Sequence, residues 1–212
     1  MLDCPLCKIS GTLLYVDAVT SKGYVHCRGC DLRFLRASDR LSLDAEQAHY
    51  EHHNNDVDDF RYQAFVSPAC DEIRKRVSVG ASGLDFGCGP ASAAAKLLRD
   101  CGYKVELYDP IFLPDARALE RDYDFVVATE VVEHFFAPLA EFQKLHGLLK
   151  VGGALVVMTL LVSDEVDFDR WYYRIDPTHV AFYSAETFDW IMNQTGFSCV
   201  EIISPRVVVL TK

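Results

Sequence analysis

Short apolar runs alternate with longer amphipathic stretches along the chain after residue 79. The short runs have the length of buried strands, and the longer stretches have the spacing of helices with one apolar face. This alternation predicts a mostly parallel sheet with helices on both faces, and two final strands joined at Ser204 and Pro205 predict an antiparallel hairpin. The predicted strands are residues 82–86, 104–108, 123–129, 154–159, 197–203 and 206–210, and the predicted helices are residues 91–100, 137–149 and 184–195, the second of them ended by Gly152 and Gly153.

The first 78 residues follow other patterns. Residues 12–16 and 23–26 are predicted to be two strands with a turn between them. Residues 39–50 are compatible with a helix, and a second helix is expected near residues 68–77, with Pro68 in its first turn, where a missing N–H is tolerated. The chain is therefore divided into residues 1–36, a helical connector at 37–78 that packs on the main domain, and a main α/β domain at 79–212.

The composition narrows the classes of partner. Half of the 212 residues are apolar, and 21 basic and 31 acidic residues give a formal charge of −10. Because non-specific nucleic-acid binding depends on Lys and Arg that neutralise phosphates, this charge argues against nucleic acid. No apolar run is long enough to span a membrane, and the first residues lack the pattern of a secretory signal, so we expect a cytoplasmic protein with no membrane partner.

Four of the eight cysteines have the spacing of a metal site. Two residues separate Cys4 from Cys7 and Cys27 from Cys30, and 19 residues lie between the pairs. A two-residue spacing lets a tight turn aim both sulfurs at one ion, and four thiolates complete the tetrahedron of Zn²⁺. With the predicted hairpin between them, the pairs look like a zinc ribbon. Four sulfurs leave no position for substrate, so the zinc is expected to be structural, with a redox dithiol or a reduced ribbon without metal as the alternatives.

A glycine turn joins the first strand of the main domain to its first helix. Asp85 is followed by Gly87 and Gly89, and such glycines let the backbone approach a ligand at the carboxyl end of a strand. Asp109 follows 20 positions after Gly89, where an acid can accept ribose hydroxyls. NAD and S-adenosylmethionine (SAM) both contain a ribose. SAM is favoured because Asp85 would face a pyrophosphate unfavourably but suits an ammonium group, and because Ser92 stands where dinucleotide-binding turns have glycine or alanine.

Five segments, in the same order, resemble class I SAM-dependent methyltransferases of the branch with small-molecule substrates. The similarity covers residues 79–212, with Ala91 in place of the third motif glycine and Val151 in place of a proline. It implies a Rossmann-like α/β fold behind a small N-terminal zinc ribbon, a combination that other methyltransferases have. The segments are residues 85–91, similar to D-x-G-x-G-x-G; Asp109; residues 129–135, similar to E-V-x-E-H; residues 148–153, similar to L-L-K-P-G-G; and residues 176–184, similar to D-P-T-H-x-x-F-Y-S.

The resemblance also implies where SAM is held. Gly87 and Gly89 would pass beneath its methionine and ribose portions, Asp109 would hold the ribose, and Pro110 would lie against the adenine. The complete cofactor set implied in this way is Asp85, Phe86, Gly87, Cys88, Gly89, Asp109, Pro110, Thr129, Glu130 and Val131.

His179 is the candidate general base, because the loop before it carries residues suited to contact an acceptor. A second role stays open, in which His179 only fastens this loop to the sheet. Glu133 and His134 are expected to cap and pack the segment after the strand at 123–129. The predicted acceptor contacts are Tyr172, Tyr173, Arg174 and Asp176, and the connector residues expected to close over the cofactor are Tyr50, His53, Asn54 and Tyr62.

Together these patterns predict a SAM-dependent methyltransferase that acts on a small molecule. Two alternatives stay open: an RNA or protein methyltransferase that docks its macromolecule on the ribbon, and a non-catalytic SAM-binding module. A dehydrogenase is disfavoured by Asp85 and Ser92. The residues identify neither the methyl acceptor nor the oligomeric state.

Overall fold

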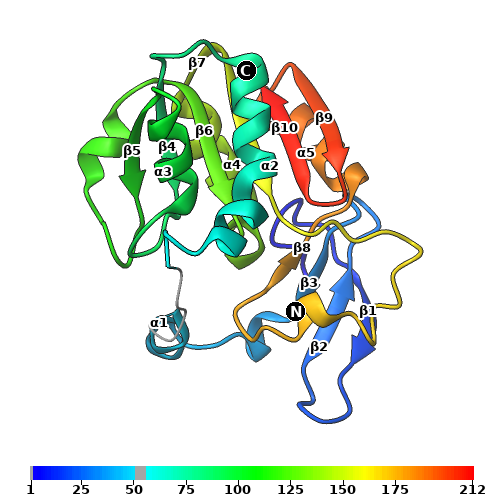
Figure 1. Cartoon of the computed structure of the whole chain (residues 1–212). Coiled ribbons are helices and arrows are strands. Elements are labelled where there is room, and N and C mark those ends of the chain that lie inside the picture. Colours follow the sequence, from blue (N-terminus) through cyan, green and yellow to red (C-terminus); the bar gives the residue numbers. More distant parts are fainter. Residues whose placement is uncertain (1, 51–55) are drawn as a thin grey trace.

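Two sheets organise the residues that the computed structural model describes, 2–50 and 56–212 (Figure 1). In the larger sheet four strands are parallel, and the last two run antiparallel to their neighbours. The mostly parallel sheet with an antiparallel C-terminal hairpin is therefore confirmed. The strand order is β5 (Lys104–Tyr108), β4 (Ser82–Phe86), β6 (Tyr123–Thr129), β7 (Leu149–Met158), β10 (Val207–Thr211) and β9 (Cys199–Ser204).

The central strand β6 shows why helices cover both faces of this sheet. Phe125 and Val127 belong to one buried cluster, whereas Val126 and Ala128 belong to another. Because successive side chains of a strand point to opposite faces, a strand that is apolar throughout needs cover on both sides. α2 (Phe60–Arg76) and α3 (Ala93–Asp100) cover one face, and α4 (Pro138–Gly147) and α5 (Ala185–Thr195) cover the other (Figure 1).

The smaller sheet joins the N-terminal ribbon to the main fold. Phe34 in its third strand is paired with Ala181 in its fourth, and the Leu35 N–H donates to the Val180 carbonyl oxygen over 2.9 Å. The ribbon therefore shares a sheet with the segment that directly follows His179. The strands, in order, are β1 (Thr12–Val16), β2 (Gly23–His26), β3 (Arg33–Leu35) and β8 (Ala181–Phe182).

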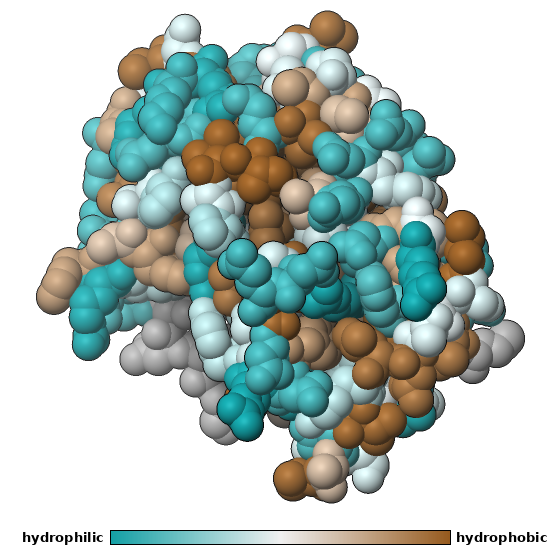
Figure 2. Space-filling view, turned by 90° about the vertical axis from the view of Figure 1, so that its right-hand side faces the viewer, coloured by the Kyte–Doolittle hydropathy of each residue, from teal (hydrophilic) through white to brown (hydrophobic). Residues whose placement is uncertain are grey.

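The outer strand of the ribbon exposes apolar side chains. Leu13, Leu14 and Val16 of β1 are 44, 42 and 45% exposed, and Val19 in the next turn is 93% exposed. Figure 2 shows apolar groups in the lower part of the molecule, where the ribbon lies. Among the strands described, β1 pairs only with β2, so it presents both a free backbone edge and an apolar surface.

Helix α2 extends further than the sequence analysis predicted. Pro68 lies inside this helix, not in the first turn of a shorter one, and the helix begins after Asp59, which caps it. Proline lacks the N–H that would bind the Ala64 carbonyl oxygen, which accepts instead from the Ser67 hydroxyl over 3.0 Å. The helix keeps its length because this bond replaces the lost one and its apolar face packs on α3 and the sheet.

Gly152 and Gly153 lie within β7, and α4 ends earlier, at Gly147, so the expectation that the two glycines end this helix was wrong. The Gly152 N–H donates to the Lys212 carbonyl oxygen over 2.9 Å, and the Lys212 N–H donates to the Gly153 carbonyl oxygen over 3.0 Å. A side chain at Gly153 would meet the Lys150 carbonyl oxygen at 2.9 Å. Gly153 therefore has no room for a side chain beside the backbone of β6 and β7, and both glycines bond to Lys212, a contact that local pattern does not reveal.

Short helices connect the larger elements. One helix was expected over residues 39–50, but Arg40 has an extended backbone and separates two helical segments.

None of the helices in the described residues is long and apolar enough to cross a membrane. His53 and Asn54, expected to close over the cofactor, lie outside the described residues. The short helices are η1 (Ala37–Asp39), α1 (Leu43–Tyr50), η2 (Ala116–Glu120), η3 (Val132–His134) and η4 (Tyr172–Arg174).

Candidate functional site

The glycine turn after β4 has a backbone that favours glycine at two positions. Gly87 and Gly89 have φ angles of +75° and +65°, in the left-handed region where a Cβ causes strain. A Cβ at Gly87 would meet the Val131 side chain at 2.6 Å, whereas a Cβ at Gly89 would stand in open space. The turn therefore packs closely on one side and leaves an open cradle on the other.

Asp85 lies buried at the base of this turn. Its Oδ2 accepts a hydrogen bond from the Ser92 hydroxyl, which also accepts from the Ala95 N–H at the start of α3. Its Oδ1 is buried and has no hydrogen-bond partner among the described residues. Burial raises the pKa of Asp85 to about 6. A buried carboxylate with one unused oxygen suits a cationic group placed beside it.

Asp109 directly follows β5 and organises the loop around it. Its carboxylate accepts hydrogen bonds from the N–H groups of Gly89, Ile111 and Phe112 over 2.9, 2.8 and 2.9 Å. The bond to Gly89 links the loops that follow β4 and β5. Because a carboxylate oxygen has more than one lone pair, Oδ2, which accepts from Gly89 alone, can also accept from a ligand hydroxyl.

One cavity of about 730 Å³ lies at the carboxyl ends of β4, β5 and β6, where open α/β sheets bind their ligands. His179 and Asp176 line this cavity, and α1 and α2 contribute Tyr50 and Tyr62 to its wall. The structure thus brings together segments that are far apart in the sequence. The cavity is lined by every residue of the implied cofactor set, namely Asp85, Phe86, Gly87, Cys88, Gly89, Asp109, Pro110, Thr129, Glu130 and Val131.

Two carboxyls follow β6, the half-buried Glu130 and the fully buried Glu133, and they meet at one tyrosine. The Tyr173 hydroxyl donates to Glu133 Oε1 and lies 3.1 Å from Glu130 Oε2. Burial raises the pKa of both glutamates. Since one hydroxyl proton cannot satisfy two carboxylates, a proton held by one of the carboxyls completes the network. Arg206 offsets negative charge at the outer end of this network, because its Nη1 lies 3.1 Å from Glu130 Oε1.

His179 is held so that one ring nitrogen keeps its lone pair. Its Nδ1 lies 2.6 Å from the Tyr173 carbonyl oxygen, which can only accept, so Nδ1 carries the hydrogen. The Nε2 atom is 3.9 Å from Glu133 Oε1, beyond hydrogen-bond distance. Burial lowers the pKa of His179, which favours the neutral ring at neutral pH. A neutral imidazole with a lone pair at a cavity wall can accept a proton.

The four predicted acceptor contacts take different positions. Asp176 lines the cavity and accepts hydrogen bonds from the N–H and the hydroxyl of Thr178. Tyr172 is 60% exposed and does not line the cavity, and Tyr173 is buried behind the two glutamates. Only Asp176 therefore joins His179 at the cavity wall.

Arg174, the fourth predicted contact, faces the ribbon. Its Nη1 lies 2.9 Å from the Asp17 carboxylate, and its guanidinium carbon is 4.7 Å from the centre of the Tyr15 ring. Its Nε donates to the Phe168 carbonyl oxygen over 2.7 Å, and its own carbonyl oxygen accepts from the Tyr24 hydroxyl over 3.2 Å. These contacts tie the loop that precedes His179 to β1 and β2.

Sequence reasoning missed several cavity residues on helices, among them charged ones. Glu46 of α1 accepts a hydrogen bond from the Tyr50 hydroxyl over 2.9 Å, and burial raises the pKa of this carboxyl. Lys144 of α4 also lines the cavity. Both look like ordinary surface charges on amphipathic helices, and only the packing of those helices against the cavity could have identified them.

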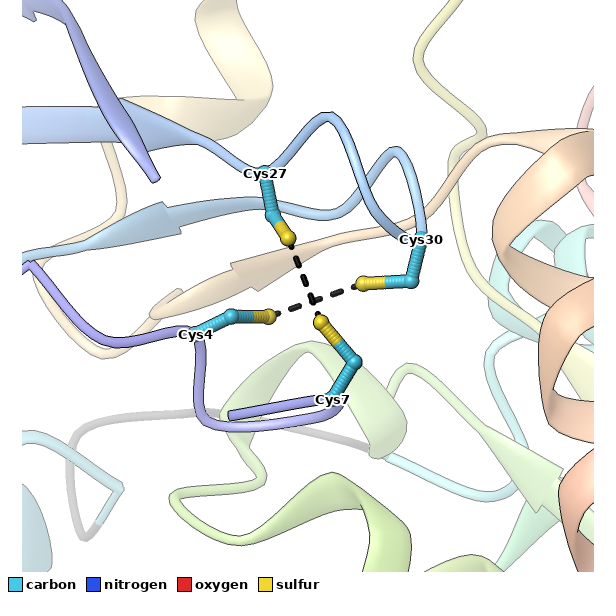
Figure 3. A group of neighbouring side chains, drawn as sticks. All are labelled: Cys4, Cys7, Cys27 and Cys30. Carbon is cyan, nitrogen blue, oxygen red and sulfur yellow. Dashed lines mark hydrogen bonds between the residues drawn. The ribbon is translucent and has the colours of Figure 1, made fainter. Parts of the chain in front are cut away.

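The four paired cysteines form a compact group of sulfur atoms (Figure 3). Their sulfurs point toward one another and lie within 4.8 Å, with 3.5 Å between Cys4 and Cys30 and 3.3 Å between Cys7 and Cys27. Zn–S bonds of about 2.3 Å place the sulfurs of a tetrahedron about 3.8 Å apart, so the group fits a zinc ion. The hydrogen bond with Cys30 lowers the pKa of Cys4 to about 5.

The two cysteine turns have matching backbones. The residue after each pair, Lys8 and Asp31, has a positive φ angle, of 66° and 59°. The first cysteine of each turn is also held alike: the Cys4 N–H donates to the Ile9 carbonyl oxygen and the Cys27 N–H to that of Leu32. Such repeated geometry aims two sulfurs from each turn at one point. Four sulfur ligands would hold Zn²⁺ in a closed, structural site.

Comparison with known proteins first identifies a family. A family model described as a methyltransferase domain matches residues 60–202. No curated protein matches the sequence.

Several solved structures share the fold. The 1,6-didemethyltoxoflavin-N1-methyltransferase of Burkholderia thailandensis, with bound 1,6-didemethyltoxoflavin and S-adenosylhomocysteine, matches with a TM-score of 0.56 and 13% identity, over 94% of this chain and 97% of that chain. A SAM-dependent methyltransferase from Archaeoglobus fulgidus matches with a TM-score of 0.52 and 15% identity, over 71% of this chain and 94% of that chain. An O-methyltransferase family protein from Burkholderia thailandensis matches with a TM-score of 0.55 and 14% identity, over 79% of this chain and 62% of that chain. At these identities the similarity is one of fold.

Proposed function

The chain belongs to the methyltransferase-domain family, and on this premise we propose that it transfers a methyl group from SAM to a small-molecule acceptor. The observation that carries the proposal is the cavity at the ends of β4, β5 and β6, where the implied cofactor set meets His179 and Asp176. A small acceptor is supported by the similar fold of the Burkholderia thailandensis enzyme, which is solved with 1,6-didemethyltoxoflavin.

SAM fits the donor side of the cavity. When bound, it would supply a methyl group: an acceptor atom would bond to the methyl carbon in line with the C–S bond, which breaks, and S-adenosylhomocysteine would leave with the electron pair of that bond. Gly89 leaves space for the ligand, and Asp85 offers its unused oxygen to the ammonium group. Asp109 would accept a ribose hydroxyl while its other bonds hold the loop, and Pro110 would flank the adenine.

We assign removal of the acceptor proton to His179. The Tyr173 carbonyl oxygen fixes Nδ1–H and leaves Nε2 to take a proton at the cavity wall. Asp176, on the same wall, would orient the acceptor. For Tyr173 and Arg174 we propose an indirect contribution to acceptor binding, since their contacts hold the loop that carries His179, and Tyr172 stays a candidate contact at its outer edge.

The zinc ribbon, which we propose to span residues 1–36, has a structural role in this scheme. Zn²⁺ held by Cys4, Cys7, Cys27 and Cys30 would fix β2 and β3, and β3 pairs with β8 directly after His179. The connector at 37–78 covers the cavity with α1 and the sheet with α2. The exposed thiols of Cys101 and Cys199 are unpaired, which suits a reducing compartment, and we propose a cytoplasmic location.

Calorimetry with SAM and with NAD tests the cofactor assignment. We expect SAM to bind at one site per chain and NAD to give no heat. Asp109→Ala should weaken SAM binding, because it removes a hydroxyl acceptor and loosens the loop, whereas Asp115→Ala, in the exposed turn that follows, should not. Binding of NAD in place of SAM would overturn the proposal.

Transfer of a labelled methyl group from SAM tests the acceptor class. The protein is incubated separately with pools of metabolites, RNA and proteins, and label is expected in the metabolite pool. Label confined to RNA would refute the small-molecule assignment.

A protein-linked acceptor is a second candidate, favoured by the apolar surface and free edge of β1. A polypeptide could add a strand to this edge and present its modified group to the cavity. Label in the protein pool that disappears with Leu13→Asp and persists with Asp3→Asn would support this candidate.

A further inference from the structure

Three potential metal ligands lie together at the acceptor side of the cavity. Glu133, His134 and His179 each offer one ligand atom, and these atoms lie within 4.8 Å of one another. The His134 and His179 rings meet edge to face with centroids 4.8 Å apart. Both histidines line the cavity, whereas Glu133 lies fully buried behind it. The group is separate from the four cysteines and has a different donor chemistry, with two nitrogens and one oxygen.

Backbone carbonyl groups hold both histidines in the manner of metal-binding imidazoles. The Nδ1 atom of His134 lies 3.1 Å from the Thr178 carbonyl oxygen, and that of His179 lies 2.6 Å from the Tyr173 carbonyl oxygen. Because carbonyl oxygens only accept, both rings carry hydrogen on Nδ1, and in the neutral ring Nε2 is the nitrogen that can bind a metal ion. Such partners orient a metal-bound histidine and fix its tautomer.

Glu133 supplies the second, independent observation. Its side chain is 0% exposed, and its Oε2 atom has no hydrogen-bond partner within the part of the chain that the structure describes. A buried carboxylate oxygen without a partner is costly, and a cation beside it removes that cost. The 3.9 Å between Glu133 Oε1 and His179 Nε2 is too long for a hydrogen bond but close to the separation of roughly 3.0–3.4 Å that two ligands of one ion adopt.

We propose that Glu133, His134 and His179 bind a divalent metal ion, and that its open positions face the cavity and take an oxygen atom of the acceptor. Two imidazoles and one carboxylate suit Zn²⁺, Mn²⁺ or Fe²⁺ and leave coordination positions free. This proposal rests on the proposed function, because it concerns the acceptor side of the same cavity. It selects acceptors that carry a hydroxyl or carboxylate oxygen.

The ion changes how His179 acts on the acceptor. Instead of taking the proton on its own nitrogen, His179 would help to hold the ion. The ion lowers the pKa of a bound hydroxyl, whose proton then leaves to solvent. The two roles of His179 can be separated because only the second requires Glu133 as a ligand.

Binding of Mn²⁺, followed by electron paramagnetic resonance, tests the site in the full chain with zinc left in the ribbon. Mn²⁺ prefers oxygen and nitrogen ligands, so it should leave the four sulfurs undisturbed. We expect one Mn²⁺ per chain in wild-type protein, weakened about tenfold or more by Glu133→Gln and by His134→Asn. His146→Asn serves as the matched control, because the His146 ring packs against Phe197 and does not line the cavity.

Each outcome decides the proposal. Stoichiometric binding that both ligand variants weaken, while the control binds normally, supports it. No binding, or binding that Glu133→Gln leaves unchanged, overturns it, and Glu133 is then simply a protonated partner of Tyr173. SAM calorimetry on the same samples separates the two proposals: loss of Mn²⁺ binding with intact SAM binding removes only the metal site, whereas absence of SAM binding removes the proposed function.

Discussion

The two ends of the cavity are built in different ways. The donor end comes from the ends of β4, β5 and β6. Asp85 lies near the end of β4, Gly89 lies in the turn after it, and the Gly89 N–H donates to the Asp109 carboxylate, which directly follows the neighbouring strand β5. The acceptor end comes from η3, from the loop before β8 and from α1, and it depends on the ribbon, which pairs with β8. One end is thus part of the sheet, whereas the other is an assembly of distant segments.

This difference separates binding of the donor from selection of the acceptor. Contacts at strand ends are rigid, because the sheet fixes both the residues and their spacing. The acceptor end can change when the ribbon, α1 or the loop before β8 changes, while the glycine turn stays as it is. If this division holds, substitutions at the acceptor end should leave SAM binding nearly unchanged, and substitutions at the donor end should leave the choice of acceptor nearly unchanged.

The largest expected effect is at His179. His179→Asn keeps an amide group that can donate to the Tyr173 carbonyl oxygen but removes the Nε2 lone pair. We expect methyl transfer to the acceptor found in the labelling screen to fall about 10²- to 10⁴-fold. The SAM dissociation constant, measured by calorimetry, should change less than about twofold, since His179 lies on the acceptor side of the cavity. A parallel loss of SAM affinity would show that the two ends are not independent.

At the donor end, Gly89→Val should weaken SAM binding itself, the property that His179→Asn is expected to leave nearly unchanged. The new side chain would stand in the open cradle and block the ligand. We expect SAM to bind about 100-fold more weakly, which corresponds to about 2.7 kcal/mol.

Gly80→Val is the matched control for Gly89→Val. Gly80 also has a positive φ, and its Cβ would also stand in open space, but it does not line the cavity. Both variants carry the same kind of backbone strain, so both should lower the melting temperature. Equal losses of SAM affinity in the two variants would show that strain, not the cradle, sets the result.

The donor end could be predicted from the sequence because its signals are local. The glycine turn, Asp109 and Glu130 each follow directly after a strand, so strand prediction places them at one edge of the sheet. All of them line the cavity. The same holds for the cysteine pairs: the two-residue spacing aims both sulfurs of a pair at one point, and the predicted hairpin between the pairs brings the two points together.

The acceptor end could not be predicted in the same way. Arg174 lies in a polar aromatic segment that fits acceptor binding, but it faces Asp17, which is 157 positions earlier in the chain. Glu46 reaches the cavity only through the placement of α1. β8 is too short to be recognised as a strand until β3 pairs with it. In each case the decisive contact joins segments far apart in sequence, which neither periodicity nor spacing reveals.

A smaller effect is expected where the ribbon holds the acceptor end. Arg174→Ala removes the ion pair with Asp17, the contact with the Tyr15 ring and the bond to the Phe168 carbonyl oxygen. We expect the melting temperature to fall by roughly 5 °C, because the side chain is buried and well bonded. The KM for the acceptor should rise only slightly, because the side chain does not line the cavity and affects acceptor binding only by holding the loop before His179.

Asp17→Ala tests the same link from the other side. The losses in melting temperature of the two single variants should not add in the double variant, because both substitutions remove one shared interaction. If Arg174→Ala instead raises the KM for the acceptor while Asp17→Ala does not, Arg174 contacts the acceptor directly.

The smallest predicted effect is the pH dependence of SAM binding. Burial raises the pKa of Asp85 to about 6, so the carboxylate that would face the ammonium group is charged at pH 7 and mostly protonated at pH 5. SAM affinity should therefore fall about tenfold between these values as pH decreases through the pKa. Asp85→Asn should bind SAM more weakly at pH 7 and lose this dependence.

Proton release gives an independent check on the same contact. An ammonium group beside Asp85 favours the ionised carboxylate, so SAM binding near pH 5 should expel a proton. Calorimetry in two buffers with different heats of ionisation would detect it, and none should be released by Asp85→Asn. A wild-type profile that stays flat from pH 7 to pH 5, with no proton released, would place the ammonium group elsewhere and leave the unused oxygen of Asp85 without a ligand.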